Sequence, residues 1–266
     1  MTHLYMASVM LLGHLLGINP AQTKVIDTKP SLIKSYSILY GKRVFKEQRA
    51  YDDQGRLIKR SSINYQLQTD GKKRILNNGR PTLYKYYSDS IKVTVNNTWI
   101  KIVLNDQALA TKEISPNGFS KTKALTTRLR YTYNKEGFLI KKVVFDDYIT
   151  YSYTTTHEYE YKNGNMVKST MTDTQKGSDG KSTNNVSVVG YEYYEDKTNT
   201  IGNINLGQKH MGKSSKNLVK RAYNLKSKHS TSYKYTFDEK GRVVKKTSFN
   251  DRNGKKTQEY QYEYAD

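Results

Sequence analysis

The chain has 266 residues, no cysteine, and 45 lysines and arginines against 24 aspartates and glutamates, for a formal net charge of +21. The absence of cysteine excludes disulfide bonds, thiol nucleophiles and cysteine-ligated zinc, and a chain of this length buries enough surface to fold without such cross-links. The charge excess favours attraction to polyanions; the alternative is a solvated charged surface without a partner. The 24 tyrosines suit half-buried strands, so the composition indicates β-structure.

The amino terminus is typical of a secretory signal. Residues 4–18 form a mostly apolar run without a formal charge, shorter than the roughly 20 residues of a membrane-spanning helix. Asn19, Pro20 and Ala21 follow, so we expect a signal peptide over residues 1–21 and a mature chain over 22–266. We therefore expect an extracytoplasmic protein: periplasmic, on the outer surface or secreted, and not a lipoprotein, because no cysteine stands at the boundary. The first three residues lack the usual cation, which leaves a buried helix or strand as the alternative.

One local pattern recurs along the chain: an aromatic residue, Asp or Asn, two polar residues, Gly and, one residue later, an aliphatic pair and Lys. Full copies lie at residues 51–59, 133–141 and 237–245, and a shortened copy lies at 161–167. In such a segment Asp or Asn bonds to nearby backbone to start a turn, and Gly takes the left-handed position that closes it. Each copy therefore predicts a β-hairpin. The irregular spacing of the copies argues against an even solenoid or propeller.

Alternation with a period of two predicts strands between these turns. Residues 91–95 and 100–104 carry two apolar rows joined by Asn96 and Asn97, which suit a tight turn. Tyrosines alternate with polar residues over 151–161, 233–237 and 260–264. The sequence therefore predicts one all-β domain, an antiparallel up-and-down meander of Tyr-rich hairpins that forms a rolled or barrel-like, soluble sheet.

Two stretches interrupt the strand pattern, residues 105–126 and 201–217. We interpret both as long loops, which are often functional. The alternative is that one of them marks a boundary between two halves of the sheet.

The turn pattern resembles the tyrosine–aspartate repeats of large secreted bacterial shell and toxin proteins. Residues 212–220, the strand 233–237 and the turn at Gly241 resemble an uncharacterised secreted family of gut Bacteroidetes, described as an all-β domain with a porin-like fold. The resemblance spans roughly residues 30–266 and is strongest over 205–266. It implies export and an up-and-down, barrel-like sheet, but no activity, since the family offers no catalytic residues to carry over.

A porin-like fold is not by itself a porin. A transmembrane barrel needs an outer row that is continuously apolar. Here the strand rows are Tyr on one face and Lys, Thr or Glu on the other, and the mean hydropathy is −0.83. We therefore do not expect an integral membrane protein.

The stretch between Lys197 and Phe237 is the best functional lead, because it contains cations and no Asp or Glu. Cations beside aromatic faces suit sugars or single-stranded nucleic acid. The alternative is a solvated basic segment. The candidate polyanion-binding residues are Lys209, Lys213, Lys216, Lys220, Arg221, Lys226, Lys228, Tyr233 and Lys234.

Catalytic signals are weak. No phosphate loop, dinucleotide fingerprint, nucleophile elbow or zinc-protease motif occurs, so we expect no catalytic residue, cofactor or metal site. His157 lies in a Tyr row and is interpreted as a strand residue. Glu158 and Glu160 have a spacing that could mimic a glycosidase pair, but charges that alternate with Tyr normally form the wet face of a sheet.

The leading hypothesis is a non-enzymatic, exported binding module for an anionic polysaccharide or lipopolysaccharide; nucleic acid is not expected for an exported protein. The alternatives are a structural or adhesion-type scaffold that contacts a protein partner and, more remotely, a glycoside-active enzyme.

Overall fold

The computed structural model describes residues 30–39, 42–67, 73–78, 80–96, 98–115, 126–202, 206–227 and 229–265. The predicted signal peptide lies outside them. The described residues form 17 strands and one short 3₁₀ helix, η1 (Lys209–Met211). The strands are β1 (Leu32–Leu39), β2 (Lys42–Tyr51), β3 (Leu57–Leu67), β4 (Lys73–Asn78), β5 (Thr82–Tyr86), β6 (Ser90–Val95), β7 (Thr98–Leu104), β8 (Ala110–Ile114), β9 (Thr126–Tyr133), β10 (Leu139–Asp147), β11 (Tyr151–Lys162), β12 (Asn165–Gly177), β13 (Ser182–Thr198), β14 (Asn217–Asn224), β15 (Ser230–Phe237), β16 (Val243–Asn250) and β17 (Lys256–Ala265).

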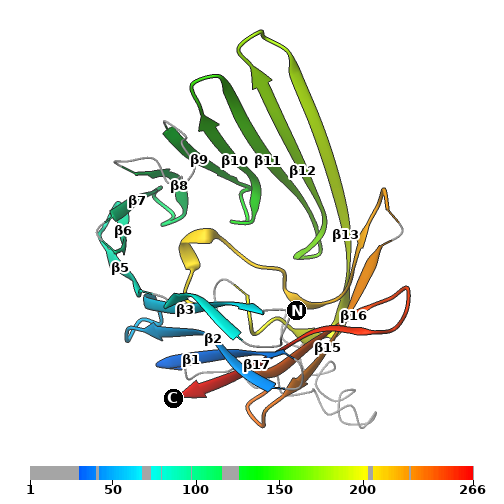
Figure 1. The fold of residues 1–266 in the computed structure, drawn as a ribbon. Coiled ribbons are helices and arrows are strands. Elements are labelled where there is room, and N and C mark those ends of the chain that lie inside the picture. The colour runs from blue at the N-terminus through cyan, green and yellow to red at the C-terminus, as the bar shows by residue number, and fades with distance from the viewer. Residues whose placement is uncertain are drawn as a thin grey trace, which may run out of the picture.

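The strands form a closed antiparallel barrel (Figure 1). Apart from β4, each strand pairs with the strands before and after it in the chain, and β1 closes the ring by pairing with both β2 and β17. The far end of β3 pairs with β4, whereas its near end pairs with β5, so β4 is a side branch and the other 16 strands make the ring. The predicted all-β meander is confirmed, and closure leaves the ring without a free edge.

The alternation predicted along the strands separates an inward from an outward row. Ile91, Val93 and Ile102 are buried inside the barrel with Tyr131. On β17 the inward row is the tyrosine row, in which Tyr262 and Tyr264 pack against a second cluster that contains Leu57. Burial raises the pKa of Tyr262 to about 12, so these rings stay neutral and serve as core residues.

The three full copies of the turn pattern share one geometry. At Asp52, Asn134 and Asp238, the side-chain Oδ1 accepts the N–H of the residue four positions on at 2.8, 2.9 and 2.8 Å. Asn105 does the same at 2.9 Å, with Ala108 at φ 58° where the other copies have glycine. The copies predicted from the sequence are confirmed as hairpin turns, and the turn at Asn105 is one that the glycine-based pattern missed.

These turns all lie at the same end of the barrel, which we call the turn rim. The chain turns at this rim between β2 and β3, β7 and β8, β9 and β10, and β15 and β16. Strand β1 starts and β17 ends beside it, where Leu32 pairs with Ala265. The shortened repeat supplies the Asn163–Gly164 turn between β11 and β12, with positive φ at both residues.

The predicted loop 105–126 is partly wrong. Its first part is the Asn105 turn followed by strand β8, which pairs with both β7 and β9. The sequence Ala110–Ile114 has only one clear polar–apolar alternation, so periodicity gave too little signal. Residues 116–125 lie outside the described residues.

The predicted loop 201–217 crosses the turn rim. We call residues 199–202 and 206–216 the crossing segment; Figure 1 shows it, in yellow, running across the end of the barrel between β3 and β8. It is held by backbone bonds to separate turns: Leu57 N–H to the Gly207 carbonyl (3.2 Å), Lys213 N–H to the Gly137 carbonyl and Lys216 N–H to the Gly164 carbonyl (both 2.9 Å). Met211 and Leu206 pack against the two core clusters, so this segment closes the rim.

The turn at Asp238 provides a direct test of this chemistry. Its carboxylate accepts the backbone N–H and the Nε–H of Arg242, both at 2.8 Å, so D238A should lower the free energy of unfolding by about 1–2 kcal/mol at neutral pH. D238N should lose less of the unfolding free energy, because Asn105 and Asn134 make the same backbone hydrogen bond in this chain.

The pH dependence of the same turn has a defined sign. Burial alone would raise the pKa of Asp238, but its hydrogen bonds to Arg242 outweigh burial and lower that pKa. Its stabilisation is therefore present above the unfolded pKa of about 3.9 and is lost as the pH falls through the lower folded value. Urea unfolding near pH 6 and near pH 2.5 measures how much unfolding free energy is lost in acid. This loss should be smaller for D238N than for the wild type, and equal losses would contradict this account.

Candidate functional site

The residues predicted to form a polyanion site are spread over the barrel. Lys209, Lys213 and Lys216 belong to the crossing segment at the turn rim. Lys226 lies between β14 and β15, at the opposite rim, and its Nζ donates to the carbonyl of Val186 (2.9 Å). Lys228 lies outside the described residues. The structure therefore does not bring this group together into one patch.

The remaining predicted residues lie on β14 and β15 and point to different sides of the wall. Tyr233 shares the inward row, where Lys246 Nζ lies 4.6 Å from its ring centre, and burial raises its pKa. Lys234 lies on the outward row, with Nζ 5.3 Å from the ring centre of Phe249, and Lys220 is exposed.

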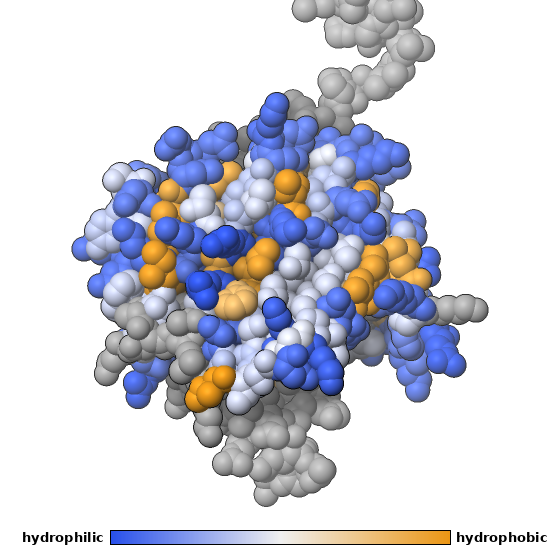
Figure 2. Space-filling model, turned by 90° about the horizontal axis from the view of Figure 1, so that it is seen from above, coloured by the Kyte–Doolittle hydropathy of each residue, from blue (hydrophilic) through white to orange (hydrophobic). Residues whose placement is uncertain are grey.

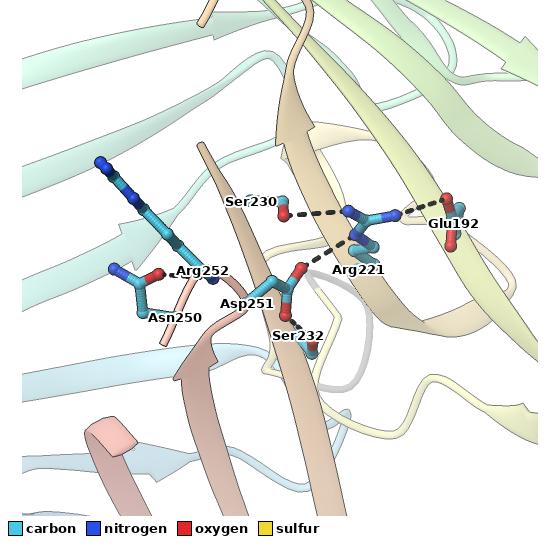
Figure 3. A network of polar contacts seen from close by, with 7 residues as sticks. All are labelled: Glu192, Arg221, Ser230, Ser232, Asn250, Asp251 and Arg252. Atoms are coloured by element: carbon cyan, nitrogen blue, oxygen red, sulfur yellow. Dashed lines mark hydrogen bonds and ion pairs between the residues drawn. The ribbon is translucent and has the colours of Figure 1, made fainter. Parts of the chain in front are cut away.

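Arg221 on β14 is matched by two acids, one on the neighbouring strand β13 and one in the turn that follows β16 (Figure 3). Its Nε lies 2.9 Å from Asp251 Oδ2 and its Nη1 lies 3.7 Å from Glu192 Oε1. Burial would raise the pKa of Asp251, but hydrogen bonds from Ser230, Ser232 and Arg221 lower it. The stretch between Lys197 and Phe237 contains no acid, but the fold brings Asp251 and Glu192 to Arg221. Arg221 is therefore not part of an uncompensated positive field.

A different surface concentrates the charge: the outward row of β5–β9. Every lysine and arginine of these strands lies on that row, and their one acid, Glu113, points inward and accepts a hydrogen bond from Tyr131. The register places Lys85 opposite Lys92 and Lys92 opposite Lys101. The cations of this outer wall are Lys85, Lys92, Lys101, Lys112, Arg128 and Arg130.

The row continues across the next strands. Lys112 lies directly opposite Arg130 and is the diagonal cross-strand neighbour of Lys101. Five neighbouring strands at about 4.8 Å spacing carry the row over roughly 20 Å of wall. Like charges directly opposite each other destabilise a sheet, so their arrangement on adjacent strands is not explained by folding.

Aromatic faces and two hollows accompany these cations. A hollow of about 340 Å³ is lined by Tyr87, Lys92, Trp99 and Lys101, together with Asp89 and Ser90. Trp99 is 38% exposed, and Lys92 Nζ lies 5.7 Å from its ring centre. The second hollow, of about 310 Å³, lies between Arg128, Arg130, Val143 and Phe145.

Asp89 is the acid that faces the first hollow. Its Oδ2 lies 3.6 Å from Lys101 Nζ, and a hydrogen bond from Ser90, followed by the charge of Lys101, lowers its pKa. One carboxylate against the cations of this wall leaves the surface strongly positive.

The carboxylates considered for glycoside chemistry are each held in an ion pair. Glu158 Oε1 lies 3.0 Å from Lys141 Nζ, and Glu160 Oε1 lies 2.7 Å from Lys168 Nζ. His157 faces the barrel interior, where burial and Lys142 lower its pKa. His210 is buried in the crossing segment, and burial lowers its pKa to about 4.

In the described part of the chain, no three His, Asp or Glu side chains gather in a way that could hold a metal ion. No helix among the same residues is long and apolar enough to span a membrane.

A comparison with known proteins assigns the chain to a family. The model of a family described as a domain of unknown function (DUF4595) with porin-like fold matches residues 50–245. The chain belongs to this family. No curated protein matches the chain.

A solved porin-like protein shares the barrel fold of this DUF4595 chain. A porin-like protein from Bacteroides uniformis is 16% identical, with a TM-score of 0.62 over 89% of this chain and 98% of that one. Another, from Bacteroides vulgatus, is 12% identical, with a TM-score of 0.49 over 90% and 99% of the two chains. The first likeness shows the barrel fold and no more.

The outward row of this DUF4595 barrel is charged along β5–β9. These strands present lysines and arginines in the middle of the wall. The face in Figure 2 likewise shows hydrophilic side chains around separate apolar patches.

Proposed function

We propose that this chain binds an anionic polysaccharide through the outer wall of β5–β9. The observation that carries the proposal is the cross-strand row Lys85–Lys92–Lys101, in which like charges face one another directly. Such a row costs stability in the free protein, and an extended polyanion that neutralises several charges at once would relieve that cost.

The side chains suit a carbohydrate with acidic groups. Lysine offers a flexible point charge with rotatable donors, which adapts to carboxylates or sulfates at irregular spacing. Trp99 and Tyr87 supply exposed aromatic surface beside these lysines, with one face apolar and the edge able to meet water. The expected export of the chain favours a polysaccharide over nucleic acid as partner.

The predicted region of residues 209–234 supports binding less well than the outer wall. Its described lysines are divided among the two rims and the strands β14 and β15. Tyr233 faces inward, and Arg221 is engaged by Asp251 and Glu192. We therefore retain the hypothesis that the chain binds a polyanion, and we propose the outer wall of β5–β9 as the binding surface in place of residues 209–234.

The decisive experiment compares two variants with the same change in charge. K85Q/K92Q/K101Q removes the cross-strand row, and K220Q/K226Q/K234Q removes three cations of the region indicated by the sequence. Binding of a heparin-like glycan to the whole chain is followed by the emission of Trp99, the single tryptophan of the chain, at about 0.15 M and about 0.5 M salt.

The outer-wall variant should bind at least about tenfold more weakly at 0.15 M salt and show a shallower salt dependence, because fewer cations engage the ligand. The second variant should bind nearly as the wild type does. Equal losses in both would show a diffuse field rather than a site, and a larger loss in the second would return the site to residues 209–234. DNA and lipopolysaccharide, titrated in parallel, show whether the wall selects one class of polyanion.

A further inference from the structure

A cavity of about 210 Å³ lies inside the barrel, away from the outer wall. It sits where the inner faces of β1, β2 and β17 meet the crossing segment, whose Ile201 and Leu206 form an apolar side. Its volume is that of roughly seven liquid waters, which suits one sugar ring and excludes a polysaccharide chain.

The charged side chains of the cavity are unevenly matched. Glu47 is only 8% exposed; its Oε1 lies 2.6 Å from Arg49 Nε, and its Oε2 pairs with Arg60. One carboxylate thus serves two guanidinium groups. Lys46 also lines the cavity, and no described carboxylate lies within ion-pair distance of it. The cavity therefore carries a positive excess, and an anionic group would balance it.

Hydrogen-bonding groups in the cavity are also unused. Ser35, Tyr260 and Tyr262 line it, and their hydroxyls bond to no other described residue. Arg49 Nε is close to Glu47 but poorly aligned, so it makes no hydrogen bond within the described chain. Buried polar groups are normally satisfied by protein or by ordered water, so the buried Arg49 Nε, together with the three hydroxyls beside it, favours a polar ligand with several hydroxyls.

We propose that this cavity binds a single acidic sugar, a monosaccharide that carries a carboxylate. The carboxylate lies between Lys46 and Arg49, where charge-assisted hydrogen bonds are strongest. The sugar hydroxyls bond to Ser35, Tyr260 and Tyr262, and the apolar face of the ring lies against Leu206. This site is separate from the outer wall and takes a ligand of a different size.

The test is a calorimetric titration of the whole chain with glucuronate, with glucose and acetate as comparison ligands. Glucuronate should bind in a saturable manner and more tightly than either. K46Q should weaken glucuronate binding by about tenfold, because one charge-assisted contact is lost, and Y260F should weaken it several-fold. K245Q makes the same charge change on the outward row, opposite Gln261, and should bind as the wild type does.

The outer-wall variant K85Q/K92Q/K101Q separates the two proposals. It should retain glucuronate binding, and glucuronate should leave the emission of Trp99 unchanged. Equal affinity for glucose and glucuronate, an unaffected K46Q whose circular dichroism matches the wild type, or the absence of saturable glucuronate binding would each overturn the cavity proposal. None of these results bears on binding of a polysaccharide at the outer wall.

Discussion

G212A should lower the free energy of unfolding by about 3 kcal/mol. Gly212 ends η1 at φ 79° and ψ −175°, a conformation that is essentially restricted to glycine and costs about 1–3 kcal/mol for other residues. A Cβ at this position would also lie 2.7 Å from the Gly137 carbonyl oxygen and 2.7 Å from Tyr133 Cε1. The carbonyl accepts the Lys213 N–H, so it cannot move without breaking the bond that anchors the crossing segment.

A thermal melt measures this effect, and G241A is the matched control. Gly241 has a similar φ of 74°, but nothing lies within 4 Å of its added Cβ, so G241A should cost about 1 kcal/mol from backbone strain alone. At about 2–4 °C per kcal/mol for a domain of this size, G212A should lower Tm by about 6–12 °C and G241A by about 2–4 °C. Equal shifts would show that the crossing segment does not depend on close contact with the turn rim.

K92E should move stability and polyanion binding in opposite directions. Lys92 lies directly between Lys85 and Lys101 on adjacent strands, so reversal of its charge replaces two repulsive pairs with two attractive ones. Cross-strand pairs contribute roughly 0.2–1 kcal/mol each, which gives a gain of about 1 kcal/mol and a rise in Tm of about 2–4 °C. Affinity for the anionic glycan should fall by about tenfold or more, because the centre of the row becomes repulsive.

K234E provides the comparison for K92E. Lys234 lies opposite Thr247 on β16, so its reversal makes the same change in net charge without relieving a cross-strand repulsion. It should leave Tm nearly unchanged and weaken glycan binding only slightly. A gain in stability without a loss of affinity in K92E would show that the row is tolerated by the fold and has no part in binding.

The like-charge row is the kind of local inconsistency that often accompanies function. A sheet optimised only for stability would place opposite charges or Thr across from Lys92. The chain does so elsewhere: Lys141 on β10 lies opposite Glu158 on β11. The contrast between like charges on β5–β9 and opposite charges on β10 and β11 favours β5–β9 as the surface that binds a ligand.

Much of the fold could be predicted from the sequence because its determinants are local. The Asx–Gly turns at Asp52, Asn134 and Asp238 lie within segments of nine residues, and alternation of Tyr with polar residues assigns the two faces of each strand. The Asn105 turn was missed because Ala108 takes the positive φ that elsewhere requires glycine. Even the Lys92–Lys101 pair could have been found, since the predicted turn at Asn96 and Asn97 places these residues opposite each other.

What only the tertiary structure decided concerns residues that are distant in the chain. Closure depends on the pairing of β1 with β17, and Arg221 acquires Asp251 and Glu192 through the register of the four strands β13–β16. The inner cavity joins Lys46 to Tyr260, and the crossing segment bonds to turns from three separate hairpins. Turn chemistry and side-chain alternation act over a few residues, so the sequence by itself determines an all-β meander; the stagger of distant strands around a closed ring determines which charges meet, and no short-range pattern encodes it.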